Sequence, residues 1–311
     1  MKWKSFALEC ALIFFAAVFL AQPARYIPVC FDGIALWAEC VLPSLFPFMV
    51  ITLIAVKSGI AQTAAKPFTR ATSAFNLPPV GAVIFLMSIC SGYPAGSRII
   101  CEFRESGAIS DGDCRKLAAL CTTSGPLFIV GSVGYKMFSD NTVGIKLLCA
   151  HILSVFAVGA IYCLAGKREK VSNALYKRTD TNILYDSFYS AVISVIVAGG
   201  FICFFYTLSV VISDYKLLFP LQYVLTYALG EAGATAVCKG VIEATGGCAA
   251  LGAGGCPLAL PLAGFLVTFG GFSILMQQLC YLVKCGVKPL FFILIKFVQG
   301  TLCFLLLLIT A

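Results

Sequence analysis

Three charged residues lie inside or beside apolar runs, where a charge costs on the order of 3 kcal/mol or more. Arg98 directly follows the motif SGYPAG, Lys296 lies within LFFILIKFVQGTLCF, and Glu231 lies within YALGEAGATAV. The cations are suited to pairing with an anionic substrate. Glu231 is suited to carrying a proton or a cation, or to pairing with Lys296. The alternatives are structural: Arg98 snorkels or pairs with Glu102 one helical turn on, Lys296 is ion-paired, and Glu231 ends a loop.

Two motifs break apolar runs, SGYPAG at residues 91–96 and TTSGP at residues 122–126. Proline removes a backbone donor and glycine permits turns, so each break frees backbone groups that must be buried in protein or face a wet cavity. Transporters use such breaks, and half-helix N-termini there favour anions. The alternative is two ordinary helix kinks. The predicted substrate-binding residues are Ser91, Gly92, Tyr93, Ser97, Arg98, Thr122, Thr123, Ser124, Gly125, Glu231, Gly271, Phe272, Gln277 and Lys296.

Other kinds of chemistry have little support in the sequence. It contains no nucleophile–base pattern, and SGYPAG lacks the G-K-[ST] ending of a phosphate loop. The sixteen cysteines include no C-x-x-C pair, and the only histidine, His151, lies on an apolar helix, where a packing role is commoner than a ligand role. We therefore expect no enzyme activity, no metal site and no cofactor.

The composition defines a polytopic membrane protein. Of the 311 residues, 60% are hydrophobic and 12% are charged, about half the charged fraction of a soluble domain. The net charge of +8 does not indicate nucleic acid, because the basic residues are scattered between apolar runs, as in cytoplasmic loops. The lipid bilayer is therefore an expected partner.

The apolar runs predict an N-terminal transmembrane helix over residues 1–30, which is either uncleaved or a signal peptide. Two transport halves follow, over residues 31–166 and 183–311. The basic segment 167–182 between them is expected in the cytoplasm by the positive-inside rule. Pro43 and Pro47 predict a broken or partly re-entrant helix early in the first half.

The two halves contain similar pieces, which predicts an internal repeat. FLMSICSGYPAGSRIICEFRESG resembles FLVTFGGFSILMQQLCYLVKCG when one gap is allowed. Interrupted segments at corresponding places in two halves point to a transporter binding site. The alternative is chance similarity between apolar helices. The matches at a constant offset of 179 are Gly92 with Gly271, Tyr93 with Phe272, Cys101 with Cys280, and Gly107 with Gly286.

The motifs SGYPAGSRII, SGPLFIVGSVG, GIKLLCAHILSVFAVG, KGVIEATGG and LAGFLVTFGGFSILMQQL resemble those of the YlbJ-like sporulation integral membrane proteins, also called stage V sporulation protein V. The resemblance covers the chain from about residue 36 to its end. One departure is CTTSGP, where the family pattern has C-N-N-SGP. Hydroxyls at Thr122 and Thr123 replace amides there, which puts the identity of the substrate in doubt.

The resemblance implies an all-α fold with a nucleoside-recognition gate domain, in which two pseudo-repeats carry re-entrant hairpins or broken helices, similar to concentrative nucleoside transporters. It also implies transport of dipicolinic acid, a small aromatic dianion, in the cell membrane or outer forespore membrane during spore formation. A coupling ion (H+ or Na+) and a homo-oligomer are further expectations. The alternatives are a carrier of nucleosides or other metabolites and a non-transporting sporulation scaffold.

Overall fold

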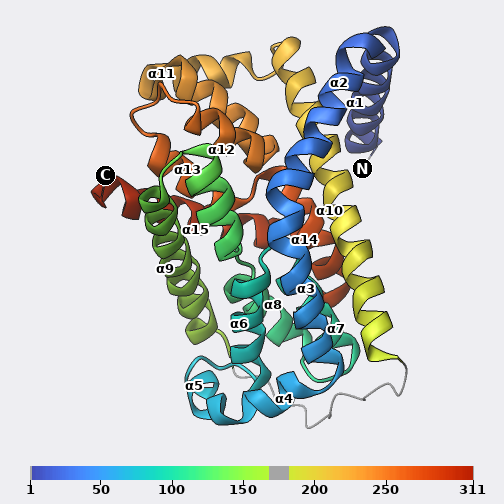
Figure 1. Ribbon diagram of the computed structural model, residues 1–311, viewed down its shortest axis with the longest axis vertical. Helices are drawn as coiled ribbons and strands as arrows, with labels where there is room; N and C mark the ends of the chain where they lie inside the picture. The colour runs from blue at the N-terminus through green and yellow to red at the C-terminus, as the bar shows by residue number, and fades with distance from the viewer. Residues whose placement is uncertain (1, 168–181, 311) are drawn as a thin grey trace.

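The described part of the chain, residues 2–167 and 182–310 of a computed structural model, contains helices and connecting turns but no strand (Figure 1). The helices of its first half are α1 (Lys2–Ala21), α2 (Pro23–Leu36), the π-helical η1 (Trp37–Val41), α3 (Leu42–Lys57), α4 (Ile60–Ala65), η2 (Lys66–Phe68), α5 (Thr69–Ala74), α6 (Val80–Ser91), α7 (Ala95–Glu105), α8 (Asp111–Leu120), the π-helical η3 (Leu127–Met137) and α9 (Asn141–Ala165). Those of the second half are α10 (Ile183–Asp214), α11 (Phe219–Ile242), α12 (Ala244–Gly252), α13 (Ala259–Phe269), α14 (Gly271–Leu282), η4 (Val283–Cys285) and α15 (Pro289–Thr310).

Within the described residues, five helical segments are long and apolar enough to cross a membrane: Pro23–Lys57, Asn141–Ala165, Ile183–Asp214, Ala259–Cys285 and Pro289–Thr310. Many large apolar side chains on these segments are exposed, which suits contact with lipid tails. The predicted class of all-helical polytopic membrane protein is confirmed. The predicted cytoplasmic segment 167–182 lies almost wholly outside the described residues.

Residues 23–57 form one continuous helical run, so the predicted break at Pro43 and Pro47 is wrong. Pro43 is the second residue of α3, which directly follows the π-helical turn η1, and this turn changes the backbone hydrogen-bond pattern where Pro43 has no donor. The Ser44 hydroxyl donates to the carbonyls of Cys40 and Val41, at 3.1 and 2.9 Å, within this run.

Helices α2 and α3 pack along α10 in the opposite direction (Figure 1). Arg25, near the start of α2, pairs with Asp214 at the end of α10, at 2.6 Å. At the other end, Lys57 donates to the carbonyl of Asp186 at 3.0 Å. We call α2, η1, α3 and α10 the long-helix group.

The helices that the two motifs were expected to break are broken at both motifs. Helix α6 ends at Ser91 and α7 begins at Ala95, while α8 ends at Leu120 and η3 begins at Leu127. Two further interruptions occur at Glu243, between α11 and α12, and at Gly270, between α13 and α14. In Figure 1, α4 to α8 occupy the lower half of the molecule, and α11 to α13 occupy the upper half.

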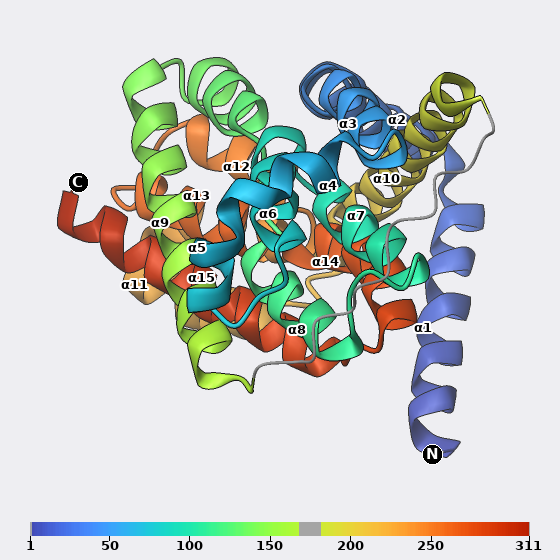
Figure 2. The same cartoon turned by 90° about the horizontal axis from the view of Figure 1, so that it is seen from below.

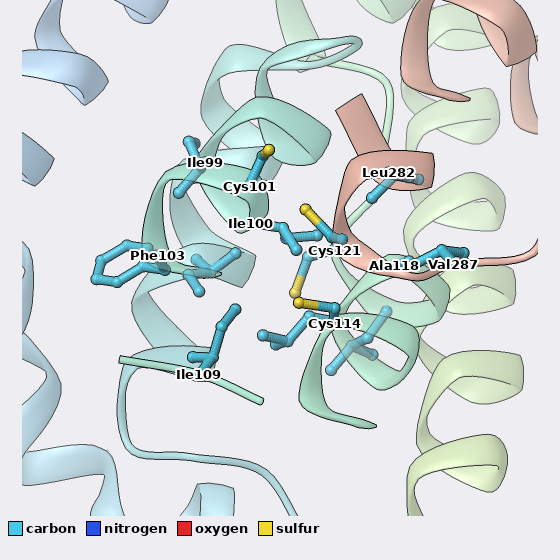
Figure 3. Packing of buried hydrophobic residues seen from close by; sticks show 14 of the residues in the cluster. Ile99, Ile100, Cys101, Phe103, Ile109, Cys114, Ala118, Cys121, Leu282 and Val287 are labelled. Carbon is cyan, nitrogen blue, oxygen red and sulfur yellow. The ribbon is translucent and has the colours of Figure 1, made fainter. Parts of the chain in front are cut away.

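Buried apolar side chains hold the lower helices together. Ile100 and Phe103 of α7, Ala118 of α8, Leu282 at the end of α14 and Val287 beyond it share one core (Figure 3). Seen from below, α6, α7 and α8 lie between α9 on one side and α10 on the other, and α1 stands apart at the edge (Figure 2). The broken helices are therefore surrounded by long ones.

Candidate functional site

The breaks touch one another through glycine backbone. Gly92 has a φ of +70°, which only glycine adopts without strain, and a Cβ added there would lie 2.6 Å from the amide nitrogen of Gly125. Gly271 has a φ of +61°, and a Cβ there would lie 2.6 Å from the carbonyl oxygen of Gly240. Because these glycines have no side chain, the backbone segments pack closely, and the breaks within each half lie together.

The two pairs of breaks also meet each other. Tyr93, from the first pair, packs against Ala244 at the start of α12 and Ile274 of α14. The Tyr93 hydroxyl donates to the carbonyl of Thr268, the residue two before the α13–α14 break, at 3.2 Å. Interruptions from four separate places in the sequence therefore converge on one region.

A small cavity lies at this convergence, with about 40 Å³ accessible to the centre of a water molecule. One wall consists of Val41, Ser44, Leu45 and Ile202 from the long-helix group. The other wall comes from the broken helices and includes six of the predicted binding residues. The residues of this second wall are Ser91, Gly92, Tyr93, Ser124, Gly125, Phe128, Thr245, Ile274 and Gln277. We call this space the central cavity.

Lys296 lies directly behind the wall of the central cavity. Its side chain is completely buried, and its ammonium donates to the Tyr93 hydroxyl at 2.8 Å and to the Thr122 carbonyl at 3.0 Å. The ammonium also lies 5.0 Å from the centre of the Tyr93 ring, within cation–π range. Among the described residues, no carboxylate forms an ion pair with Lys296, so the predicted alternative of an ion-paired lysine has no partner here.

His151 bridges the breaks of the two halves. Its Nε2 accepts from the backbone N–H of Ser124 at 2.9 Å, so this nitrogen carries no proton. The proton is then on Nδ1, which donates to the Thr268 hydroxyl at 2.9 Å. The imidazole is fully buried and neutral, and it fixes the unwound segment after α8 to the end of α13.

Glu243 is a buried acid at the break between α11 and α12. Its two carboxylate oxygens accept from the backbone N–H groups of Thr245 and Gly246, at 3.0 and 2.6 Å, and so cap the N-terminus of α12. Glu243 and His151 were not predicted as site residues. Only their positions, a lone histidine in an apolar helix and an acid beside TGG, could have indicated them.

Arg98 lies outside the lining of the central cavity and is held by protein groups. Its guanidinium pairs with Glu102 at 3.3 Å, donates to the Ser190 carbonyl at 3.2 Å, and hydrogen-bonds to the Ser194 hydroxyl. It also lies 5.9 Å from the centre of the Tyr281 ring. The structure therefore contains the ion pair with Glu102 that the sequence left as the alternative.

The remaining predicted residues divide into two sets. Ser97, Thr122, Thr123 and Gly271 are buried beside the breaks but outside the cavity lining, and the Thr123 hydroxyl has no hydrogen-bond partner among the described atoms. Glu231, just after the α11 kink at Gly230, and Phe272 are exposed. The structure does not bring Glu231 to Lys296, because Lys296 is enclosed by Tyr93 and Thr122.

No group of three or more histidine, cysteine, aspartate or glutamate side chains that could hold a metal ion occurs within residues 2–167 and 182–310. The polar groups at the central cavity are instead hydroxyls, an amide, free backbone groups and the lysine behind Tyr93. Groups of this kind are suited to hydrogen bonds and charge interactions with an organic molecule.

Spanning helices and a cavity between broken helices define an integral membrane protein with an internal cavity. Comparison with known proteins shows which protein the sequence is similar to. The chain is 27% identical over 331 aligned positions to the sporulation integral membrane protein YlbJ of Bacillus subtilis (strain 168), and the match covers 96% of this chain and 81% of that protein. The chain is therefore similar to YlbJ over nearly its whole length, as its motifs indicated. No family model and no solved structure matches it.

Proposed function

We propose that this protein transports a small organic anion across the membrane and is not an enzyme. The observation that carries the proposal is Lys296, a buried cation without an acidic partner among the described residues, set behind the wall of the central cavity. A buried charge that lacks a counter-charge is costly, and an anion in the cavity would offset part of that cost.

The ends of the broken helices support an anionic substrate. Helices α7 and α14 and the π-helical η3 all begin at the breaks, and none has a side-chain hydrogen bond at its N-cap. Their first N–H groups and helix dipoles therefore favour negative charge at the convergence. Helix α12 differs, because Glu243 already occupies its N-terminus.

The order and direction of the helices support an inverted repeat. In Figure 1, α2–α3 descends and α10 ascends, and each half then continues with a short segment, a helical pair, a broken helix and a final long helix. The helical pairs would be re-entrant hairpins, α6–α7 from below and the second part of α11 with α12 from above. This pairing relates Gly92 to Glu243, whereas the sequence matches relate Gly92 to Gly271. An inverted repeat of this kind would agree with the expected similarity to concentrative nucleoside transporters.

For the substrate we propose dipicolinate, carried during spore formation across the cell membrane or the outer forespore membrane. The similarity to a sporulation membrane protein supports this setting. The Tyr93 ring lines the cavity and could stack on the pyridine ring, while Lys296 and the free N–H groups suit the two carboxylates. A gradient of H+ or Na+ would drive transport, in a monomer or a homo-oligomer.

One observation favours a nucleoside as the second candidate. The residues that line the central cavity directly include no charged side chain, and Ser44, Thr245 and Gln277 offer neutral hydrogen-bonding groups of the kind that suit a nucleoside. The two candidates differ in their dependence on Lys296, because a neutral substrate gains little from a cation behind the wall.

Uptake into proteoliposomes tests the proposal. Labelled dipicolinate should accumulate under an imposed H+ or Na+ gradient, and Lys296→Gln should reduce uptake at least about tenfold. Lys288→Gln, an exposed lysine before the same helix, is the matched control and should transport normally. If excess nucleoside inhibits uptake and the Lys296→Gln variant shows the same uptake as the unaltered protein, a nucleoside is favoured as the substrate. If neither substrate is transported while deletion still blocks sporulation, the protein is a scaffold.

A further inference from the structure

A second polar pocket lies between the end of α10 and α11, outside the central cavity. It has about 20 Å³ accessible to the centre of a water molecule, and it differs from the central cavity in having two lysines, Lys216 and Lys239, in its lining. The hydroxyls of Ser209, Ser213 and Thr235 and the amide of Gln222 also line it. We call it the upper pocket, because it lies at the upper end of α10 in Figure 1.

The fold of α11 assembles this pocket. At Gly230 the backbone leaves the helical conformation, with a φ of +71°, so the two parts of α11 change direction and face each other. The Gln222 amide of the first part donates to the Thr235 hydroxyl of the second part at 2.9 Å. Lys216 is held in the turn after α10 at a φ of +52°, which is uncommon for a residue with a side chain.

The acids near the upper pocket are already engaged. Asp214 accepts two hydrogen bonds from Arg25, at 2.6 and 2.7 Å, and one from the Tyr26 hydroxyl. It also interacts electrostatically with Lys239. Glu243, one turn after Lys239, is bonded to the N-terminus of α12. Within residues 2–167 and 182–310, neither pocket lysine has an ion-pair partner.

We propose that the upper pocket binds an anionic carboxylate or phosphate group. Two ammonium groups that line one small pocket repel each other unless an anion lies between them, and the hydroxyls and amide supply the remaining hydrogen bonds. The anion is either a small dianion on its way to or from the central cavity or the headgroup of an acidic lipid. The first source rests on the transport function proposed above, and the second does not.

The upper pocket lies close enough to the central cavity to be an intermediate binding site for an anion that moves between them. Ser209 lines the upper pocket and Ile202 lines the central cavity, and they are seven residues, or roughly 10 Å, apart along α10. Ile242 lines the upper pocket and Thr245 lines the central cavity, with the carboxylate of Glu243 between them. An anion that moved from one space to the other would pass the tip of α11 and α12.

Direct binding to the full-length protein tests the inference. The probes are labelled dipicolinate, counted by equilibrium binding in neutral detergent, and phosphatidylglycerol, detected on the intact protein by native mass spectrometry. The variant is the double substitution Lys216→Gln with Lys239→Gln. Lys284→Gln removes a different exposed lysine and is the control, and arginine at both pocket positions should retain binding.

The expected result is that the double glutamine variant weakens one class of binding at least about tenfold while the control and the arginine variant do not. Loss of one dipicolinate site, with a second site sensitive only to Lys296→Gln, identifies the small dianion. Loss of bound phosphatidylglycerol alone identifies the lipid. If Lys296→Gln has no effect but the pocket variant does, the transport proposal fails and this inference stands. If the pocket variant binds both probes like the unaltered protein, the inference is overturned.

Discussion

At the scale of single residues, the hydroxyl of Tyr93 connects the cavity wall to the cation behind it. It accepts from Lys296 and donates to the Thr268 carbonyl, so both of its hydrogen-bonding roles are used. Tyr93 was predicted as a binding residue because it lies beside a glycine in SGYPAG, but the sequence could not show that Lys296, 203 positions away, lies within hydrogen-bond distance of it. Pairing between distant residues is decided by the fold.

Replacing Tyr93 by phenylalanine should destabilise the protein by about 1–3 kcal/mol, because a buried ammonium and a buried carbonyl each lose a partner. Thermal unfolding in detergent, followed by intrinsic fluorescence, measures the change. Tyr227→Phe is the control, because that hydroxyl bonds only to Tyr223 at an exposed surface, and its effect should stay within about 0.5 kcal/mol. Equal melting temperatures for the two variants would contradict the role given to Tyr93.

His151 offers a second prediction at this scale. His151→Ala should destabilise the protein by about 2–4 kcal/mol, because the Ser124 N–H and the Thr268 hydroxyl lose their shared partner and a void remains. It should also abolish uptake, since the two halves lose their bridge. Cys149→Ala, an exposed position on the same helix, is the control. A His151→Ala protein that melts like the unaltered protein would show that the bridge does not stabilise the fold.

At the scale of elements, the sequence predicted where two helices break, but it did not predict which other segments lie beside those breaks. Glycine and proline mark SGYPAG and TTSGP locally, so the ends of α6 and α8 could be found without knowledge of the fold. The break at Glu243 has no proline, and its acid is stable there only because α12 begins beside it. At Pro43 the sequence predicted a break that does not occur, because a π-helical turn directly before α3 keeps the helical run continuous.

The contact between breaks gives a prediction for glycine. Gly92→Ala should reduce both stability and uptake, because the new Cβ would meet the Gly125 backbone at 2.6 Å and the residue would keep a positive φ. Gly200→Ala is the matched control, since nothing lies within 4 Å of a Cβ there and alanine favours the helix by roughly 0.5–1 kcal/mol. Uptake and melting temperature are measured for both variants. Normal uptake by Gly92→Ala would show that this contact is not needed.

At the scale of the whole molecule, helices that run in opposite directions place the turns after α3 and α10 at opposite ends (Figure 1). The exposed Lys66 and Arg70 and the partly exposed Arg104 and Arg115 belong to or flank the lower end, so by the positive-inside rule we expect this end to face the cytoplasm. The sequence indicated a polytopic protein but did not fix this arrangement, because hydropathy counts spans without pairing them.

Cysteine labelling of intact cells tests the orientation. A cysteine at Arg70 should react with a membrane-impermeant maleimide only after the membrane is opened, and a cysteine at Lys216 should react in intact cells, because both positions are exposed at opposite ends. The native exposed cysteines at positions 10, 90, 149 and 280 are replaced by serine in the background protein. Labelling of both positions from one side would rule out the inverted arrangement.

The central cavity is bounded on one side by the long-helix group and on the other by the broken helices, so any molecule that fills it touches both parts at once. Such a molecule holds the two parts together and stabilises the folded state, so by mass action the melting temperature of the protein rises with the concentration of the molecule. Candidate compounds can therefore be ranked on purified protein by thermal shift alone, before any vesicle is prepared.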